Sequence, residues 1–436
     1  MSQFHLRPAP GLGAIRSPRR RAGCALLVLL ALPLLHPASA HAQGLSLAEA
    51  ESIALERDAM LRQMAADAEA MRQRAIMDGQ LMDPKLRVGA VNVPVDTFSL
   101  RDEDMTMLEV GVSQEFAPGD SRQLARKRME QSASAMEAVA VDRRRLVRRE
   151  VRKLWTQLAF VTAARDLLDT QTEWVDQMRQ SARTRYASGE GKQLDVLQAG
   201  LDAAMLREQR LDLDRDEAMA RSQLSFWIGT DAAATATPTG LPARAEVEPL
   251  ATLEQRLAAH PAQADYERRL DAADTAVALA REKRKPGWML DVSYGFRQDM
   301  DEMSRPDMLS AMVTVDLPLF RANRQDREVN ATRAEARSLH ERHQDHLREM
   351  QAMLNEAWNV ATRTAELEQF YETELLPLAE QSIQAALLAW RGNRAMIDEV
   401  VMARRVALET RTKHLRLAAD RALAQYEIDY LAGEER

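Results

Sequence analysis

The sequence contains almost no cysteine. Its one thiol, Cys24, lies close to the N-terminus and ahead of an apolar segment. A single cysteine excludes a framework of intramolecular disulfides. Because Cys24 precedes the apolar segment and does not follow it, the residue is badly placed to carry a lipid. We therefore expect no lipid attachment.

Long uncharged runs are also missing. The apolar segment at 24–35 has about twelve residues, whereas a membrane-spanning helix needs roughly 20, and no other stretch approaches that length. Arginines precede this segment, and small residues suited to cleavage follow it at 38–42, which is typical of a secretory signal peptide. We predict that residues 1–42 are this signal and that the rest of the chain has no membrane-spanning helix.

The chain has too little positive charge for a partner of nucleic acids. Its net charge is −7, and removing residues 1–42 takes away five arginines and no acid, which makes it −12. An acidic surface argues against nucleic-acid binding. Catalytic motifs are missing too: the sequence has no phosphate-binding glycine loop, no nucleophile elbow and no His-Glu-x-x-His pair. We predict no enzyme activity and no cofactor.

What the sequence does contain is an internal duplication. Residues about 203 positions apart are similar over most of the chain, which is the pattern of two structural repeats. We predict a first repeat at 43–229 and a second at 250–436, joined by an irregular linker at 230–249. The clearest matching pairs are Trp155 and Trp358, Gly189 and Gly392, Leu194 and Ile397, and Asp195 and Asp398.

Each repeat opens with a helical segment and continues with two short alternating stretches. The helical segments are 46–80 and 250–284, and each is followed by a proline. The alternation has a period of two, with one face apolar, as in half-buried strands. We predict β-hairpins at 85–116 and 287–318, whose strands, near ten residues, have the length of transmembrane strands.

A very long helix follows each hairpin. From 120 to 188 the sequence has neither glycine nor proline, and 69 helical residues would extend roughly 100 Å. The second long helix, at 322–390, contains Pro377, which we expect to kink or break it.

Each of these helices ends at a glycine turn, at Gly189 and at Gly392, after which a second helix returns along it. The predicted products are two long helical hairpins, at 119–228 and 322–432. Such hairpins are far longer than a globular domain needs.

The predicted strands require partners. In lipid, open sheet edges would leave backbone groups without hydrogen bonds. One chain offers four strands, whereas closed barrels begin at about eight. We therefore predict a mainly α chain with a small transmembrane β-barrel portion that several subunits build together.

The duplicated order of helix, strand hairpin, very long helix, glycine turn and return helix resembles the TolC family of outer-membrane efflux factors over nearly the whole chain. Residues 395–400 after Gly392 look like the turn motif of that family, and 194–199 is the closer copy. The resemblance implies a homotrimer with a shared twelve-strand β-barrel in outer-membrane lipid and a twelve-helix α-barrel in the periplasm. It also implies a periplasmic adaptor protein and an inner-membrane pump as partners.

Two short stretches of the sequence bear on which substrate is exported. The stretches 83–86 and 112–119 are similar to the heavy-metal branch of the family, which serves pumps of the resistance-nodulation-division class. This similarity implies a passive duct for heavy-metal cations, with drug or general export as the alternative. A periplasmic adaptor or coiled-coil scaffold is a further alternative, although an adaptor needs one helical hairpin and several β-rich modules. A simple porin fails for lack of strands.

Two acids lie just after the glycine turns, where the helices of a tunnel must converge. In a trimer, Asp398 or Asp195 would form a ring of three carboxylates that repel one another and attract cations, so we consider both, with the adjacent Glu399, as candidates for a periplasmic gate. The alternative is a first-turn acid that stabilises its own helix. Where the family often has a second acid three residues after the first, this chain has Val401, and its second acid is Glu399, directly after Asp398. Gly189 and Gly392 are candidates for adaptor contact.

Two further groups could contact metal, although we expect neither to be a metal site. Thioethers in the strand-connecting loop would suit soft cations, but a solvated loop explains them as well. Three histidines spaced by three share one helix face, as ordinary polar residues also do. The residues are Met300, Met303 and Met308 in the loop, and His340, His343 and His346 on the helix.

Overall fold

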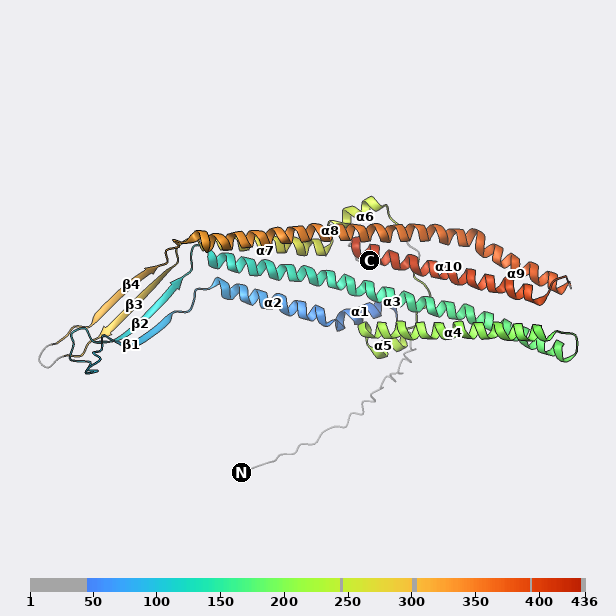
Figure 1. Ribbon diagram of the computed structural model, residues 1–436, viewed down its shortest axis with the longest axis horizontal. Helices are drawn as coiled ribbons and strands as arrows, with labels where there is room; N and C mark the ends of the chain where they lie inside the picture. The colour runs from blue at the N-terminus through green and yellow to red at the C-terminus, as the bar shows by residue number, and fades with distance from the viewer. Residues whose placement is uncertain (1–44, 244–245, 300–303, 393, 433–436) are drawn as a thin grey trace, which may run out of the picture. The chain divides into compact units, whose positions relative to one another are not determined.

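The computed structural model describes residues 45–243, 246–299, 304–392 and 394–432. These residues belong to one structural unit, an elongated body with a small sheet at one end and helices along the rest of its length (Figure 1). The predicted signal peptide, 1–42, lies outside the described residues. Within the described residues, no helix combines the length and the apolar character needed to cross a membrane.

The first half of the chain follows the predicted order of elements. It contains α1 (Leu47–Arg57), α2 (Ala59–Gly79), β1 (Lys85–Val91), β2 (Met107–Phe116), α3 (Ser121–Ala187), α4 (Gln193–Ile228) and α5 (Thr230–Thr235).

The second half repeats this order with one added interruption. It contains α6 (Leu250–Leu257), α7 (Pro261–Glu282), β3 (Trp288–Phe296), β4 (Met308–Val315), the 3₁₀ turn η1 (Arg321–Asn323), α8 (Gln325–Phe370), the π-helical turn η2 (Tyr371–Leu375), α9 (Leu376–Arg391) and α10 (Ile397–Ala432).

The opening helical segments differ from the prediction, because each is split in two. In the first half Asp58 is the break: its extended backbone ends α1, and its carboxylate accepts a hydrogen bond of 2.8 Å from the Leu61 N–H, which starts α2. In the second half the break lies at His260. The segment 230–249, expected to be irregular, begins with the short helix α5.

The long helices follow the distribution of helix breakers. α3 runs for 67 residues through the stretch without glycine or proline. In the second half, α8 gives way to the π-helical turn directly before Pro377, which is the second residue of α9. A proline lacks the N–H that would bond the preceding turn, and a wider turn relieves the clash of its ring.

The two strand hairpins are not separate. β2 pairs with β3, so all four strands form one antiparallel sheet in the order β1-β2-β3-β4. At the helical end of this junction the rings of Phe116 and Trp288 stack with their centroids 3.9 Å apart. The sheet therefore continues from one half of the chain into the other, and its open edges are β1 and β4.

The two faces of the sheet differ in chemistry. On one face Arg87 lies between two acids and makes ion pairs of 2.8 Å with both Glu109 and Asp291. The other face carries large apolar side chains that are exposed in a single chain. These are Leu86, Val88, Leu108, Val110, Val112, Trp288, Val292, Tyr294, Phe296, Leu309, Val313 and Val315.

The duplication is visible in the packing of the helices. Two buried clusters, one in each half, join the base of a long hairpin to the helix that opens the half. Their members correspond at an interval of 203 residues, so each half buries the same positions. The pairs are Ala50 and Leu253, Ala54 and Leu257, Val147 and Met350, Val151 and Leu354, Leu158 and Ala361, and Ile228 and Leu431.

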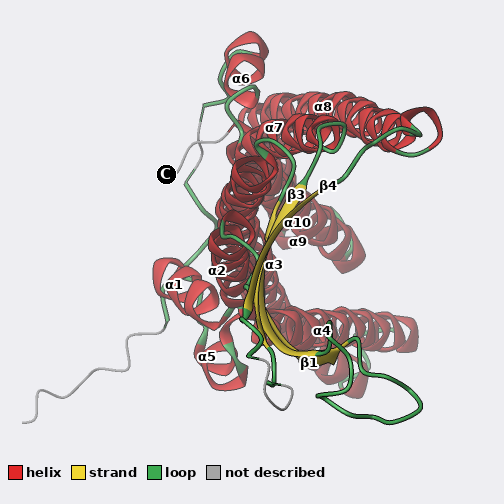
Figure 2. Cartoon of the chain, turned by 90° about the vertical axis from the view of Figure 1, so that its left-hand side faces the viewer, coloured by secondary structure: helices red, strands yellow, loops and turns green. Residues whose placement is uncertain are grey.

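Seen from the sheet end, the long helices follow a curved wall, and the sheet curves in the same sense (Figure 2). The short helices α1 and α5 lie on the convex side of this wall. The far end of the wall, opposite the sheet, consists of the tips of the two long hairpins, where the candidate gate residues lie (Figure 1).

Candidate functional site

The turns at the hairpin tips are built differently. Gly189 has a φ of +80°, a left-handed conformation that favours glycine, and open space surrounds it. Gly392 has a φ of −85° and needs no such freedom. A side chain at Gly392 would instead meet its neighbours, because a Cβ would lie 3.3 Å from the Leu388 carbonyl oxygen.

The candidate acids occupy unequal positions. Asp195 is in the first turn of α4, and its carboxylate accepts a hydrogen bond of 3.2 Å from the Lys192 N–H. In α10 the same role falls to Glu399, which accepts a bond of 3.4 Å from the Met396 N–H. Asp398 is exposed and has no hydrogen-bond or ion-pair partner within the described part of the chain. Asp195 therefore matches Asp398 in the sequence repeat, but the residue that matches its capping role is Glu399.

All three acids line one groove between the two hairpin tips. The groove has a volume of about 510 Å³ and takes side chains from α3, α4, α9 and α10. Trp390 and Met402 contribute apolar surface, while Arg185 and the ion pair of Asp202 with Arg405 contribute charge. Neither Gly189 nor Gly392 is among the lining residues.

The tips of the two hairpins are tied together by α10. Arg405 of α10 pairs with Asp202 of α4, at positions that correspond between the halves at an interval of 203. The neighbouring Arg404 lies 4.3 Å from the ring centre of Trp174 on α3, and burial lowers the pKa of this guanidinium. Leu408 packs nearby on a small apolar cluster of the first hairpin. Asp202 and Arg405 occupy matching positions of the two repeats but carry opposite charges, so similarity at the interval of 203 does not reveal their ion pair.

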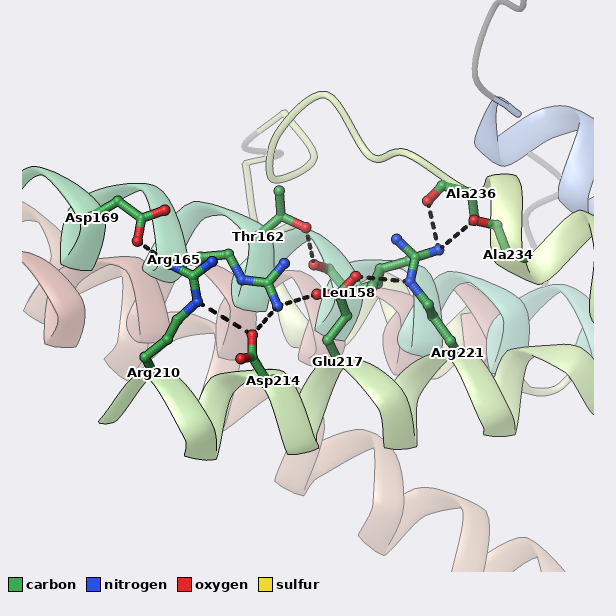
Figure 3. Close-up of polar contacts among 10 residues, drawn as sticks. All are labelled: Leu158, Thr162, Arg165, Asp169, Arg210, Asp214, Glu217, Arg221, Ala234 and Ala236. Carbon is green, nitrogen blue, oxygen red and sulfur yellow. Dashed lines mark hydrogen bonds and ion pairs between the residues drawn. The ribbon is translucent and has the colours of Figure 1, made fainter. Parts of the chain in front are cut away.

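Further from the tip, the first hairpin is held in register by charge (Figure 3). Arg165 of α3 makes ion pairs with Asp214, at 2.5 Å, and with Glu217 of α4. Burial raises the pKa of Glu217, but the nearby Arg221 and Arg165 outweigh it and hold this pKa below its usual value. Arg221 also contacts the backbone of α5, where its guanidinium donates a hydrogen bond of 2.7 Å to the Ala233 carbonyl oxygen.

The three helix histidines differ in their surroundings. His343 and His346 lie against the ring of Tyr266 from α7, and the Nε2 atom of His343 is 2.6 Å from the Gln263 side-chain oxygen. His340 is exposed. Within the described residues, no group of three or more histidine, cysteine or acidic side chains could hold a metal ion.

Of the three loop methionines, Met308 alone lies within the described residues. Met300 and Met303 lie outside the described residues, whereas Met308 is the first residue of β4.

Comparisons with known proteins show the fold. No protein-family model matches the chain, and no curated protein matches it significantly. Solved outer-membrane channels do match in structure. The outer membrane protein VceC from Vibrio cholerae superimposes with a TM-score of 0.75 at 16% identity, covering 89% of this chain and 96% of VceC. The Campylobacter jejuni CmeC outer membrane channel gives 0.74 at 13% identity, covering 89% of this chain and 85% of CmeC. CusC gives 0.71 at 16% identity, covering 89% of this chain and 92% of CusC.

The chain therefore has the fold of these channels, mainly helical with a small sheet portion.

Proposed function

We propose that the chain is the outer-membrane channel of a tripartite efflux system, a passive conduit of the TolC type and not an enzyme. The observation that carries the proposal is a four-stranded sheet with one apolar face and two open edges, attached to helical hairpins whose longest helix has 67 residues. Exposed apolar side chains on one face suit contact with lipid. The likeness to solved outer-membrane channels supports the same conclusion.

The channel is a homotrimer in this proposal. β1 and β4 each present unpaired backbone groups along an edge, and lipid offers no hydrogen bonds to satisfy them. Three copies joined edge to edge, β1 to β4, would close a barrel of twelve strands. The polar face with Arg87, Glu109 and Asp291 would then line its lumen, and the hairpins would continue the duct through the periplasm.

The groove at the hairpin tips supports a gate in the periplasmic end of the duct. Asp398 is exposed and unpaired within the described residues, so it is available to face the axis, whereas Asp195 and Glu399 already accept hydrogen bonds from their own helix ends. We assign the ring of carboxylates to Asp398 first. The ion pair of Asp202 with Arg405 would hold the two hairpins of a chain together in the closed arrangement.

The proposed partners are a periplasmic adaptor, which would meet the turns at Gly189 and Gly392, and an inner-membrane pump of the resistance-nodulation-division class. The proposed cargo is heavy-metal cations. The similarity of residues 83–86 and 112–119 to the heavy-metal branch supports this choice, and an acidic duct would favour cations.

The first test is fractionation followed by native mass measurement of the detergent-solubilised protein. The expected result is a trimer extracted from the outer membrane that conducts ions in planar bilayers. A folded monomer in detergent, or recovery in the soluble periplasmic fraction as for an adaptor, would contradict the proposal.

The cargo is tested separately by deleting the gene and scoring tolerance to copper, silver, zinc, cobalt and cadmium beside a drug panel. A loss of tolerance to metals alone supports the heavy-metal assignment. A loss of tolerance to drugs alone would contradict the heavy-metal assignment and indicate drug export.

A further inference from the structure

The polar face of the sheet carries an unexpected side-chain type. By the strand register, Met107, Met289, Met308 and Met312 all lie on the face of Arg87 and not on the apolar face. None of the four is fully buried: Met312 is 63% exposed in the chain, and Met107, Met289 and Met308 are partly exposed. Thioethers on a hydrophilic surface are candidates for binding soft cations.

Two of these methionines lie beside one glycine on the same face, Met107 by contact and Met308 by strand register. Gly295 of β3 is the register partner of Glu109 on β2 and of Met308 on β4. The sulfur of Met107 lies where a Cβ on residue 295 would stand. Directly opposed side chains of an antiparallel pair have their Cβ atoms about 5 Å apart. The missing side chain at Gly295 thus leaves a notch over β3 that the Met107 thioether enters from β2, and Met308 is the neighbour of this glycine on β4.

The carboxylate opposite Gly295 is already held in an ion pair, through an arginine that it shares with Asp291. The Glu109 carboxylate, 16% exposed, is held by Arg87 at 2.8 Å. Neutral sulfur therefore lies beside a carboxylate that is engaged by arginine, and thioether ligands suit a soft cation.

We propose that Met107 and Met308 form a binding site for a soft monovalent metal cation, Ag⁺ or Cu⁺, on the polar face of the sheet around Gly295. The site rests on the proposed function in one respect, since the polar face lines a lumen only if the sheet closes into a barrel. Three copies would place three such sites around the duct. Binding by two thioethers is weak enough for release, as conduction requires.

The test uses the purified, full-length protein in detergent and measures Ag⁺ binding by calorimetry. Leucine fills nearly the volume of methionine but has no sulfur, so the double variant Met107→Leu/Met308→Leu keeps the packing. It is expected to lose about one Ag⁺ equivalent per chain relative to the parent. Zn²⁺ binding should be unchanged, because zinc prefers nitrogen, oxygen and thiolate ligands.

The matched control is Met289→Leu, on the same face but six residues along β3 from Gly295, roughly 20 Å away. It should bind as much Ag⁺ as the parent. Equal Ag⁺ binding by the parent and the double variant, or an equal loss in the control, would overturn the site.

A second measurement needs no variant. Bound Ag⁺ should slow peroxide oxidation of Met107 and Met308, read by mass spectrometry, more than that of Met289. Equal protection of all three would also overturn the site. Bilayer conductance of the same preparation separates the two proposals: a conducting trimer without the Ag⁺ effect refutes the site alone, whereas no trimer refutes the proposed function.

Discussion

At the scale of single residues, the two repeats have diverged most where a gate would operate. Asp195 and Glu399 each accept a hydrogen bond from the backbone at the start of their helix. Capping of this kind is the ordinary structural role of an acid in a first helical turn. Asp398 is one residue ahead of that position and is exposed. Asp398 makes no hydrogen bond to the start of its own helix within the described residues, so it is the better candidate for a charge that faces the axis.

This difference gives a prediction with opposite outcomes at two residues. Asp398→Asn should weaken cation selectivity and block by multivalent cations in single-channel recordings, with a loss of stability below about 1 kcal/mol from the weaker interaction with the helix dipole. Asp195→Ala should leave selectivity near that of the parent and loosen α4 by about 0.5–2 kcal/mol per chain, because alanine removes the acceptor of the Lys192 N–H bond. If Asp398→Asn lowers stability and leaves selectivity as in the parent, Asp398 is structural and the gate assignment is wrong.

His260 provides a test of pH dependence. Its side chain is fully buried: Nδ1 accepts a hydrogen bond from the Ala262 N–H at 3.2 Å, and Nε2 lies 3.0 Å from the Tyr430 carbonyl oxygen, to which it donates. Burial lowers the pKa of this imidazole, and the carboxylate of Asp142 opposes the shift only in part. The folded chain therefore holds His260 neutral.

A pKa that is lower in the folded than in the unfolded state means that the unfolded chain binds more protons as the pH falls. Stability from neutral His260 should be complete above the unfolded pKa of about 6.5 and decline below it. Thermal melts of the parent from pH 7.5 to 5 should show this decline, and a His260→Gln variant should show a smaller one. Equal slopes in the two proteins would exclude His260 as the source.

At the scale of elements, the long helices were predictable and the short breaks were not. α3 could be read from the absence of glycine and proline, and the interruption of the second long helix from Pro377. The break at Asp58 has neither residue. It depends on a carboxylate cap and on the ion pair of Asp58 with Arg143, 85 positions away, which no local pattern reveals.

The strands of the sheet were also predictable, whereas their pairing between the two halves was not. Alternation predicted the four strands and which face of each is apolar, because a period of two is a local signal. It did not predict that β2 pairs with β3, since those strands are separated by α3 and α4 and their pairing is set by the packing of the two halves. The groove of the tips was likewise beyond sequence reasoning: the three acids were expected at the hairpin tips, but no local pattern indicated that they line one groove.

The connection between sheet and helices contains a position that only glycine fits well. Gly119, between β2 and α3, has a φ of +53°, and a Cβ there would fall on the carboxylate of Glu282. That carboxylate accepts a hydrogen bond of 2.8 Å from the Asp120 N–H at the start of α3. The glycine thus allows α7 to cap the longest helix.

Gly119→Ala should destabilise the protein by about 1–2 kcal/mol from the left-handed backbone alone, and more if Glu282 is displaced. The change is measured by thermal unfolding followed by circular dichroism. Gly200→Ala is the matched control, since open space surrounds Gly200 within α4 and alanine favours a helix there. A melting temperature for Gly119→Ala equal to that of this control would disprove the strain.

At the scale of the whole molecule, the open edges of the sheet predict which surfaces meet between copies. Cysteines placed together on both edges, as in Val88→Cys/Ala311→Cys, should be linked between chains by a bifunctional maleimide, giving dimers and trimers on a denaturing gel. Val112→Cys/Val292→Cys is the control, because these two residues are register partners inside one chain. If the edge pair yields only monomers, as the control should, edge-to-edge assembly is excluded.

The long hairpins of the two halves agree in length, and this agreement restricts how the protein can vary. α3 has 67 residues, and Gln325 to Arg391 also spans 67, while α4 and α10 have 36 each. Removing one residue from the middle of α3 would turn everything beyond it by about 100° and shorten it by about 1.5 Å. The tip would then present another side of the helix to its neighbours. Viable length changes must therefore come in near-whole turns and in all four arms at once, so the periplasmic reach of such a molecule can change only in discrete, concerted steps.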